Sequence, residues 1–99
     1  MTKRQEALAN INDLACIGVQ AIEAQKARRV WLDARALNSR LLRAYSSETG
    51  EAYIGGAEEV TADPEIDAAY AERRRAGKEV QKQARKLRSM VNRYQAGLK

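Results

Sequence analysis

The chain has 99 residues and a mass of 11.1 kDa, enough for one small domain and too few for two hydrophobic cores. Hydrophobic residues make up 44% and charged residues 31%, with one Pro, six Gly and no Phe. Residues that favour helix outnumber those that favour strand, which excludes an all-β fold. With no His and a single Cys, the chain lacks the usual general base, Cys–His nucleophile pairs, disulfide frameworks and most zinc sites. We therefore expect no enzymatic activity, no metal and no cofactor.

The N-terminal segment could be mistaken for a targeting signal, because Lys3 and Arg4 precede a moderately apolar run. Asn10, Asn12 and Asp13 interrupt that run, so it resembles neither a signal-peptide core nor a membrane span. A single Cys and the lack of an export signal are typical of a reducing compartment. We expect a cytoplasmic protein with no membrane segment.

A first long helix is predicted over about residues 2–45, where there is no Pro and Gly18 is the only Gly. Its apolar residues follow one another mostly in steps of three and four, which is typical of one helix face. They are Leu8, Ile11, Leu14 with Ala15, Gly18, Ile22, Val30, Ala34, Leu37, Leu41 and Ala44 or Tyr45. The phase of this stripe slips by about one residue around residues 25–29, which predicts a supercoil adjustment or a kink there.

A second helix is predicted over about residues 64–97. Asp63 supplies a capping carboxylate, Pro64 suits the first helical position, and Glu65 opposes the helix dipole. A seven-residue apolar repeat follows, interrupted by Arg73 and Gly77. Its positions are Ile66, Tyr70, Arg73, Gly77, Val80, Ala84, Leu87, Val91, Tyr94 and Leu98. Such a repeat predicts a helix-packing seam.

Arg73 falls within this predicted seam, where a guanidinium needs a partner or a route to solvent. One interpretation pairs it with an acid of the first helix, Asp33 or Glu23. The other lets its long stem reach water beside Gly77.

An acidic linker is predicted between the helices, over residues 46–63. Glu51–Val60 could form a small β-hairpin around a Gly55–Gly56 turn, because that turn requires positive φ at both central positions. A Glu-rich loop without strands is the alternative, and the sequence leaves both open.

The predicted fold is all-α: residues 1–99 form a single helical domain, a long hairpin of two antiparallel helices joined by the acidic linker. Two helices bury only the stripe between them, so a chain of this size has apolar surface to spare. We expect a homodimer, either a four-helix bundle or an antiparallel coiled coil. The predicted interface residues are Ile22, Val30, Trp31, Leu37, Leu41, Val80, Leu87, Val91 and Tyr94.

The net charge of +5 conceals a strong segregation along the chain. Residues 1–43 carry eight bases and four acids, and residues 44–72 carry eight acids and no base. Residues 73–99 carry ten bases against Glu79 alone. Segregation on this scale is more than a solvated surface needs, but it need not mean binding. The acidic loop could pair with basic positions of the same chain, or the basic residues could serve solubility alone.

Basic residues of the second helix recur on the side away from its apolar stripe. Arg75, Lys78, Lys82, Arg85 and Arg93 form the row, with Lys86 beside it and Arg74 and Arg88 on its flank. The face is about 27 Å long at a rise of 1.5 Å per residue. Such a face matches a phosphate backbone, where Lys and Arg displace condensed counterions. We expect a non-enzymatic protein that binds nucleic acid or another polyanion through this face.

Two other functions fit the same charges. In one, the basic helix and the acidic loop hold complementary patches of an acidic protein surface, as in a small inhibitor or adaptor, phage-encoded ones included. In the other, the chain is a sponge for small phosphorylated ligands, with Arg clusters holding phosphate and Tyr53, Tyr70 or Tyr94 stacking on a base.

Overall fold

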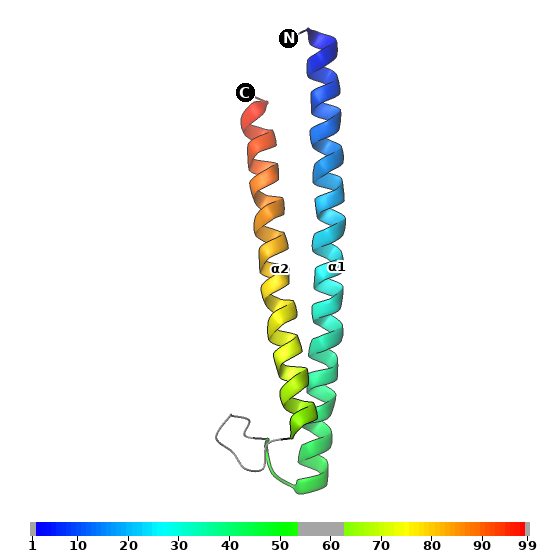
Figure 1. Cartoon of the computed structure of the whole chain (residues 1–99), viewed down its shortest axis with the longest axis vertical. Helices are drawn as coiled ribbons and strands as arrows, with labels where there is room; N and C mark the ends of the chain where they lie inside the picture. The colour runs from blue at the N-terminus through cyan, green and yellow to red at the C-terminus, as the bar shows by residue number, and fades with distance from the viewer. Residues whose placement is uncertain (1, 54–62, 99) are drawn as a thin grey trace.

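A computed structural model describes residues 2–53 and 63–98 as two antiparallel helices (Figure 1). The first, α1, spans Lys3–Thr49, and the second, α2, spans Pro64–Gly97. They form a rod of 70 × 21 × 17 Å. The predicted all-α helical hairpin is confirmed, and the described residues contain no strand. Most of the segment in which a small β-hairpin was predicted, residues 54–62, lies outside the described residues.

Local hydrogen bonds set the ends of both helices. Thr2 caps α1 in a reciprocal capping box with Gln5. At the other end, Gly50 adopts φ 73°, and its amide donates to the Ser46 carbonyl at 2.8 Å, so α1 extends four residues beyond the predicted end at Tyr45. The Asp63 carboxylate caps α2, as its position before Pro64 predicts.

The seam between the helices is a pair of seven-residue repeats in perfect alternation of three- and four-residue steps. On α1 the repeat consists of Ile17, Gln20, Ala24, Ala27, Trp31, Ala34, Asn38, Leu41 and Tyr45, all half-buried or buried. On α2 it consists of Ile66, Ala69, Arg73, Ala76, Val80, Gln83, Leu87, Met90 and Tyr94, and a few flanking residues such as Leu42 and Val91 are half-buried as well. Small residues are interspersed with large ones along both repeats. The ring of Trp31 lies over Gly77, and a β-carbon added to Gly77 would be 3.4 Å from Nε1 of Trp31. The repeats run without a phase slip through residues 25–29.

The predicted apolar stripe of the first helix packs on α2 only in part. Ala34, Leu41 and Tyr45 lie in the seam, whereas Ile22, Val30 and Leu37 are exposed over 55%, 54% and 45% of their surface. The stripe is therefore wrong as a continuous seam, because α1 places alanines and the amides of Gln20 and Asn38 against α2 in place of these larger aliphatic residues. On α2, Tyr70 and Leu98 are likewise more than half exposed.

Polar side chains complete two layers of the seam. Asn38 is 1% exposed, and its Oδ1 accepts from Nη1 of Arg73 at 3.2 Å, while its Nδ2 has no protein partner. The interpretation that pairs Arg73 with an acid of the first helix is wrong, since a neutral amide accepts from its guanidinium. Arg73 is half-buried, so its side chain keeps part of its access to solvent, as the other interpretation expects. Farther along, Gln20 donates from Nε2 to Oε1 of Gln83 at 2.6 Å. These bonds engage an amide group in each layer and align the helices lengthwise.

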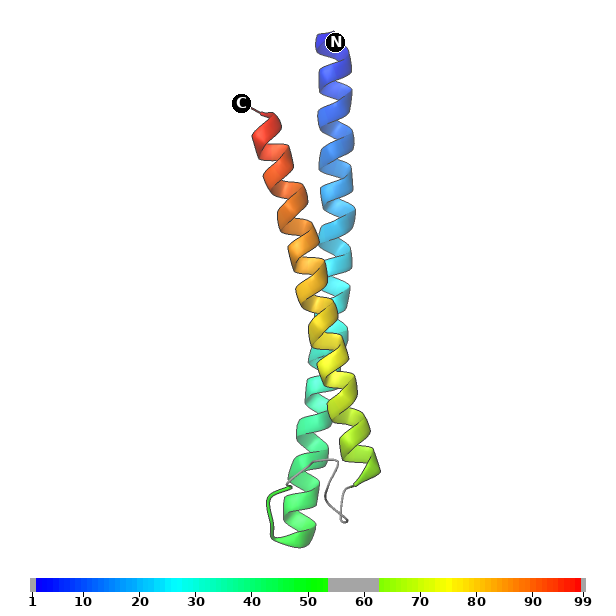
Figure 2. The same ribbon diagram turned by 60° about the vertical axis from the view of Figure 1, so that its left-hand side comes forward.

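The two helices separate toward the end that holds both termini, as Figure 2 shows. Continuing the α1 seam by the same steps reaches Asp13, Asn10 and Glu6, which are polar. Residues 2–16 are all exposed as a result. Close packing of α2 against this part of α1 would bury little apolar surface, so the hydrophobic effect does not hold the helices together there.

The opposite end is held by Tyr53, which follows α1 in the chain. Its ring packs edge-on against Tyr45, with centroids 5.0 Å apart. Its hydroxyl donates to Oδ1 of Asp67 at 2.5 Å and accepts from the Asp63 amide at 3.1 Å. Tyr53 thus connects the end of α1 to the first turn of α2.

Replacing Asn38→Leu and Arg73→Leu together should stabilise the hairpin. The double change removes an unpartnered buried amide and a partly buried charge and adds apolar contact, so the free energy of unfolding should rise by about 1–2 kcal/mol in urea titrations. The matched single change Asn38→Leu leaves Arg73 without its acceptor and should gain less. A double variant no more stable than the wild type would contradict this account.

Alkaline pH should weaken the Tyr53 connection. The hydrogen bond to Asp67 raises the pKa of Tyr53 above its ordinary value of 10.0. Its contribution to stability is therefore complete below the unfolded-state pKa and is lost as pH rises through the folded-state pKa. The melting temperature should fall as the pH rises above about 10, and by less in Tyr53→Phe. Equal losses in the wild type, Tyr53→Phe and the control Tyr70→Phe would exclude this role.

Candidate functional site

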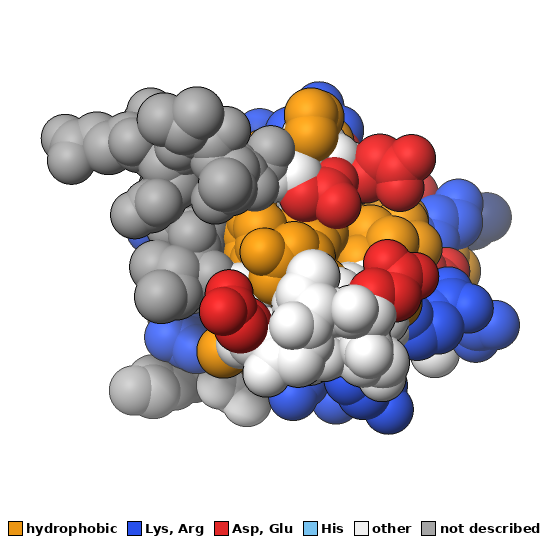
Figure 3. Space-filling model, turned by 90° about the horizontal axis from the view of Figure 1, so that it is seen from below, with side chains coloured by type: hydrophobic (Ala, Val, Ile, Leu, Met, Phe, Trp, Pro, Cys, Tyr) orange, Lys and Arg blue, Asp and Glu red, His pale blue; other side chains and the backbone are white. Residues whose placement is uncertain are grey.

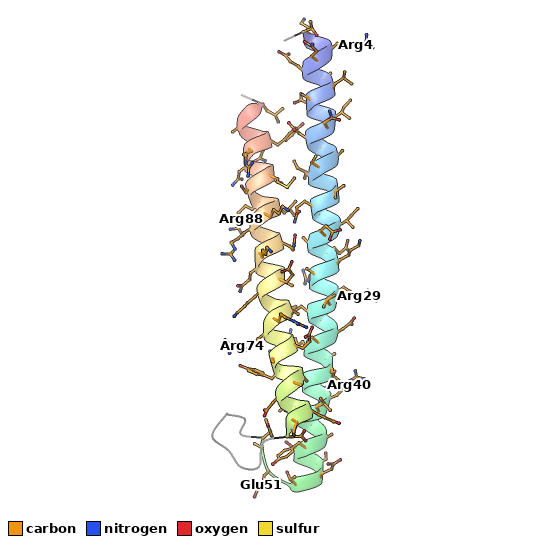
Figure 4. All side chains as sticks on the ribbon, viewed as in Figure 1. Arg4, Arg29, Arg40, Glu51, Arg74 and Arg88 are labelled. Atoms are coloured by element: carbon orange, nitrogen blue, oxygen red, sulfur yellow. The ribbon has the colours of Figure 1, made fainter. Side chains whose placement is uncertain are left out.

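The predicted basic residues of α2 all lie on its exposed surface. The seam repeat turns one side of α2 toward α1, and the opposite side carries the cations. They are Arg74, Arg75, Lys78, Lys82, Arg85, Lys86, Arg88 and Arg93, and each is exposed. In Figure 4, Arg74 and Arg88 project from α2 away from α1. We call these eight residues the basic face.

Carboxylates leave most of the basic face unpaired. Within residues 2–53 and 63–98, Arg75 is its one member in an ion pair, with Glu72. Glu79, the only acid after residue 72, accepts from Nε2 of Gln83 at 2.7 Å. Because Gln83 also accepts from Gln20 in the seam, this carboxylate is engaged beside the seam, and it forms no ion pair with any described residue. The basic face therefore keeps its positive charge.

The C-terminal part of the basic face is a shallow hollow of about 410 Å³. Its lining residues are Arg85, Arg88, Ser89, Asn92, Arg93 and Ala96. Nη2 of Arg93 donates to Oγ of Ser89 at 3.1 Å, which holds one guanidinium along the helix surface. Three arginines with a hydroxyl and an amide can donate several hydrogen bonds to phosphate oxygens.

A second, larger groove of about 700 Å³ runs along the flank of the seam. Ile22, Leu32, Val80 and Ala84 provide its apolar surface, and α1 contributes cations. These cations are Lys26, Arg28 and Arg29. Lys26 lies 3.6 Å from Glu23 in an exposed ion pair. Sequence reasoning missed this groove, although the run of bases in residues 26–29 was its signal.

Negative charge gathers at the end of the rod where α1 ends and α2 begins. Figure 3 looks onto this end and shows carboxylate side chains around it. The acids described there are Glu48, Glu51, Asp63, Glu65, Asp67 and Glu72. We call the described residues of this end, 44–53 and 63–72, the acidic tip. The rod thus carries opposite charges at different positions along its length.

The other predicted positions divide between the seam and the surface. Trp31, Leu41, Val80, Leu87, Val91 and Tyr94 are half-buried along the seam. Ile22, Val30 and Leu37 lie on the exposed sides of α1. Their contact with a second copy stays a prediction.

The three tyrosines considered for base stacking have different surroundings. Tyr53 is engaged by Tyr45 and Asp67. Tyr70 is exposed, with the Arg74 guanidinium 6.0 Å from its ring centroid, and Tyr94 is half-buried. Of the three, Tyr70 offers a ring beside the basic face.

Neither α1 nor α2 contains an apolar stretch suited to crossing a bilayer, and the part of the chain that the structure describes has no cluster of potential metal ligands. Comparisons with protein-family models, with curated proteins and with solved structures found no match. The exposed basic face is accordingly the feature from which a function can be argued.

Proposed function

We propose that the chain is a non-enzymatic binding protein whose basic face holds a nucleic acid. The observation that supports this most is the arrangement of eight exposed cations on one helix, of which Arg75 alone pairs with a described carboxylate. Polyanion binding draws its free energy from counterions that such cations release.

The length of the basic face suits a nucleic-acid backbone. Arg75 and Arg93 are separated by about 27 Å along α2, which corresponds to about eight phosphates of one strand. Guanidinium and ammonium groups at these positions contact phosphate oxygens without reading bases. The proposed interaction is therefore independent of sequence.

The acidic tip determines how the rod lies on its ligand. Residues 44–72 carry eight acids, so they are repelled by a polyanion. The strand therefore follows the part of α2 that comes after Arg73 and leaves the tip in solvent. The cations of the flank groove, Arg28 and Arg29, belong to α1 and stand apart from this row.

Reversing two charges of the basic face should abolish binding. Lys82→Glu/Arg85→Glu removes two phosphate contacts and adds two repulsive carboxylates at its centre. In mobility-shift assays with duplex and single-stranded oligonucleotides at several salt concentrations, the wild type should bind with a steep negative salt dependence. Neutral changes at the same two positions should reduce that slope by about 2.

The control Arg40→Glu/Arg43→Glu makes the same change in net charge on exposed residues of α1. It should retain most of the binding, and circular dichroism should show unchanged helicity for both variants. Binding that survives the Lys82/Arg85 reversal would place the ligand elsewhere. No mobility shift even at low salt would reject nucleic acid and favour an acidic protein surface.

A further inference from the structure

The outer side of α1 between Leu8 and Ile22 is apolar and unpartnered. A second seven-residue repeat, Leu8, Ile11, Ala15, Gly18 and Ile22, runs along it in steps of three and four. Ile22 lies two residues from both Gln20 and Ala24 of the seam, about 200° around the helix, so this repeat follows the side of α1 away from the seam. At its C-terminal end, Ile22 also borders the flank groove. We call it, together with Leu14 and Val19 at its edges, the outer face.

The outer face exposes more apolar surface than scattered hydrophobic residues require. Leu8, Ile11, Leu14, Val19 and Ile22 are each exposed over 51% to 61% of their surface. Residues 14–22 contain no charge, which is unusual in a chain with 31% charged residues. Gly18, with no atom within 4 Å of a β-carbon built on it, leaves room for the backbone of another helix.

The chain has enough spare surface for a stable interface. Its accessible surface, polar and apolar together, is 8071 Å², whereas a compact folded monomer of this mass exposes about 5,700 Å². The difference of about 2,400 Å² reflects the elongated shape, and it leaves room for the roughly 800 Å² that each partner contributes to a standard interface.

We propose that the outer face is a self-association surface, on which the same face of a second copy packs in antiparallel orientation. An uncharged apolar stripe with small central residues matches another stripe of the same kind, and a two-fold axis pairs them. Ala15 and Gly18 let the helices approach, while the larger residues on either side close over the contact.

Charge selects the antiparallel orientation. In a parallel pair, the two acidic tips, each with six described acids and no base, would lie side by side and repel. In an antiparallel pair centred near Ala15, they lie at opposite ends of the assembly. Both basic faces stay in solvent in this dimer, because the outer face belongs to α1 and the basic face to α2. An experiment can therefore reject dimerisation without rejecting nucleic-acid binding, and the reverse.

The oligomeric state tests the outer face directly. In sedimentation over about a hundredfold range of concentration, the wild type should show a monomer–dimer equilibrium. Ile11→Lys/Ile22→Lys should raise the dimer dissociation constant by about a hundredfold or more. The control is Val30→Lys. Val30 lies outside the outer face and is 54% exposed, against 55% for Ile22. This change should leave the dimer dissociation constant within about threefold of the wild-type value. A wild-type monomer at all concentrations, or equal effects of the two variants, would overturn the proposal.

Spin labels test the orientation. A label on the exposed Cys16 should give a short distance between copies, because this residue lies near the centre of the interface. In Cys16→Ser/Ser46→Cys, labels near the tips should be separated by about 90 Å in the antiparallel pair. A short distance from position 46 would reject the antiparallel orientation, as would a long one from position 16.

Discussion

The hairpin depends on the match between two narrow seven-residue repeats, one on each helix. Each repeat presents about one residue in every three or four to the other helix, so the contact is a single seam rather than a core. Only Ile66, Ala69 and Ala76 are buried apolar side chains among the described residues. Most charged residues therefore lie on the outward surfaces of the helices. On α2, the order of residues along the helix determines that acids group near its start and cations along the rest.

Polar layers within the seam contribute specificity. The bonds from Arg73 to Asn38 and from Gln20 to Gln83 form only when the helices are aligned lengthwise as observed. Apolar contacts alone would tolerate a shift by one repeat, because alanines recur along both helices. A polar layer in a seam costs stability and excludes such alternatives.

The helices and their caps could be predicted from the sequence, whereas the seam on α1 could be predicted only in part. Ala34, Leu41 and Tyr45 of the predicted stripe lie in the seam, but the large aliphatic residues Ile22 and Val30 do not. Toward the N-terminus the seam uses Ala24 and Gln20, and small or amide side chains stand out little in a hydrophobic pattern. The partner that makes such an amide acceptable, such as Gln83 for Gln20, becomes visible only across the seam.

The exposure of the basic face was easier to predict, for a geometric reason. The predicted seam of α2 used Tyr70 and Gly77, and the observed one uses Ala69 and Ala76, a rotation of about 100° at alternate positions. Both seams include Arg73, Val80 and Leu87, and a cation such as Lys82 lies outside either. The flank groove escaped prediction because it combines side chains of two helices.

The divergence of the helices at the end with both termini creates a gradient of local stability along the rod. Residues 2–16 of α1 bury no side chain, so their helical turns are held by backbone hydrogen bonds and the Thr2 cap. At the other end, Tyr53 ties both helices together. Backbone amides near the termini therefore open first and exchange fastest with solvent, and protection increases toward the buried layers at Asn38 and Ile66.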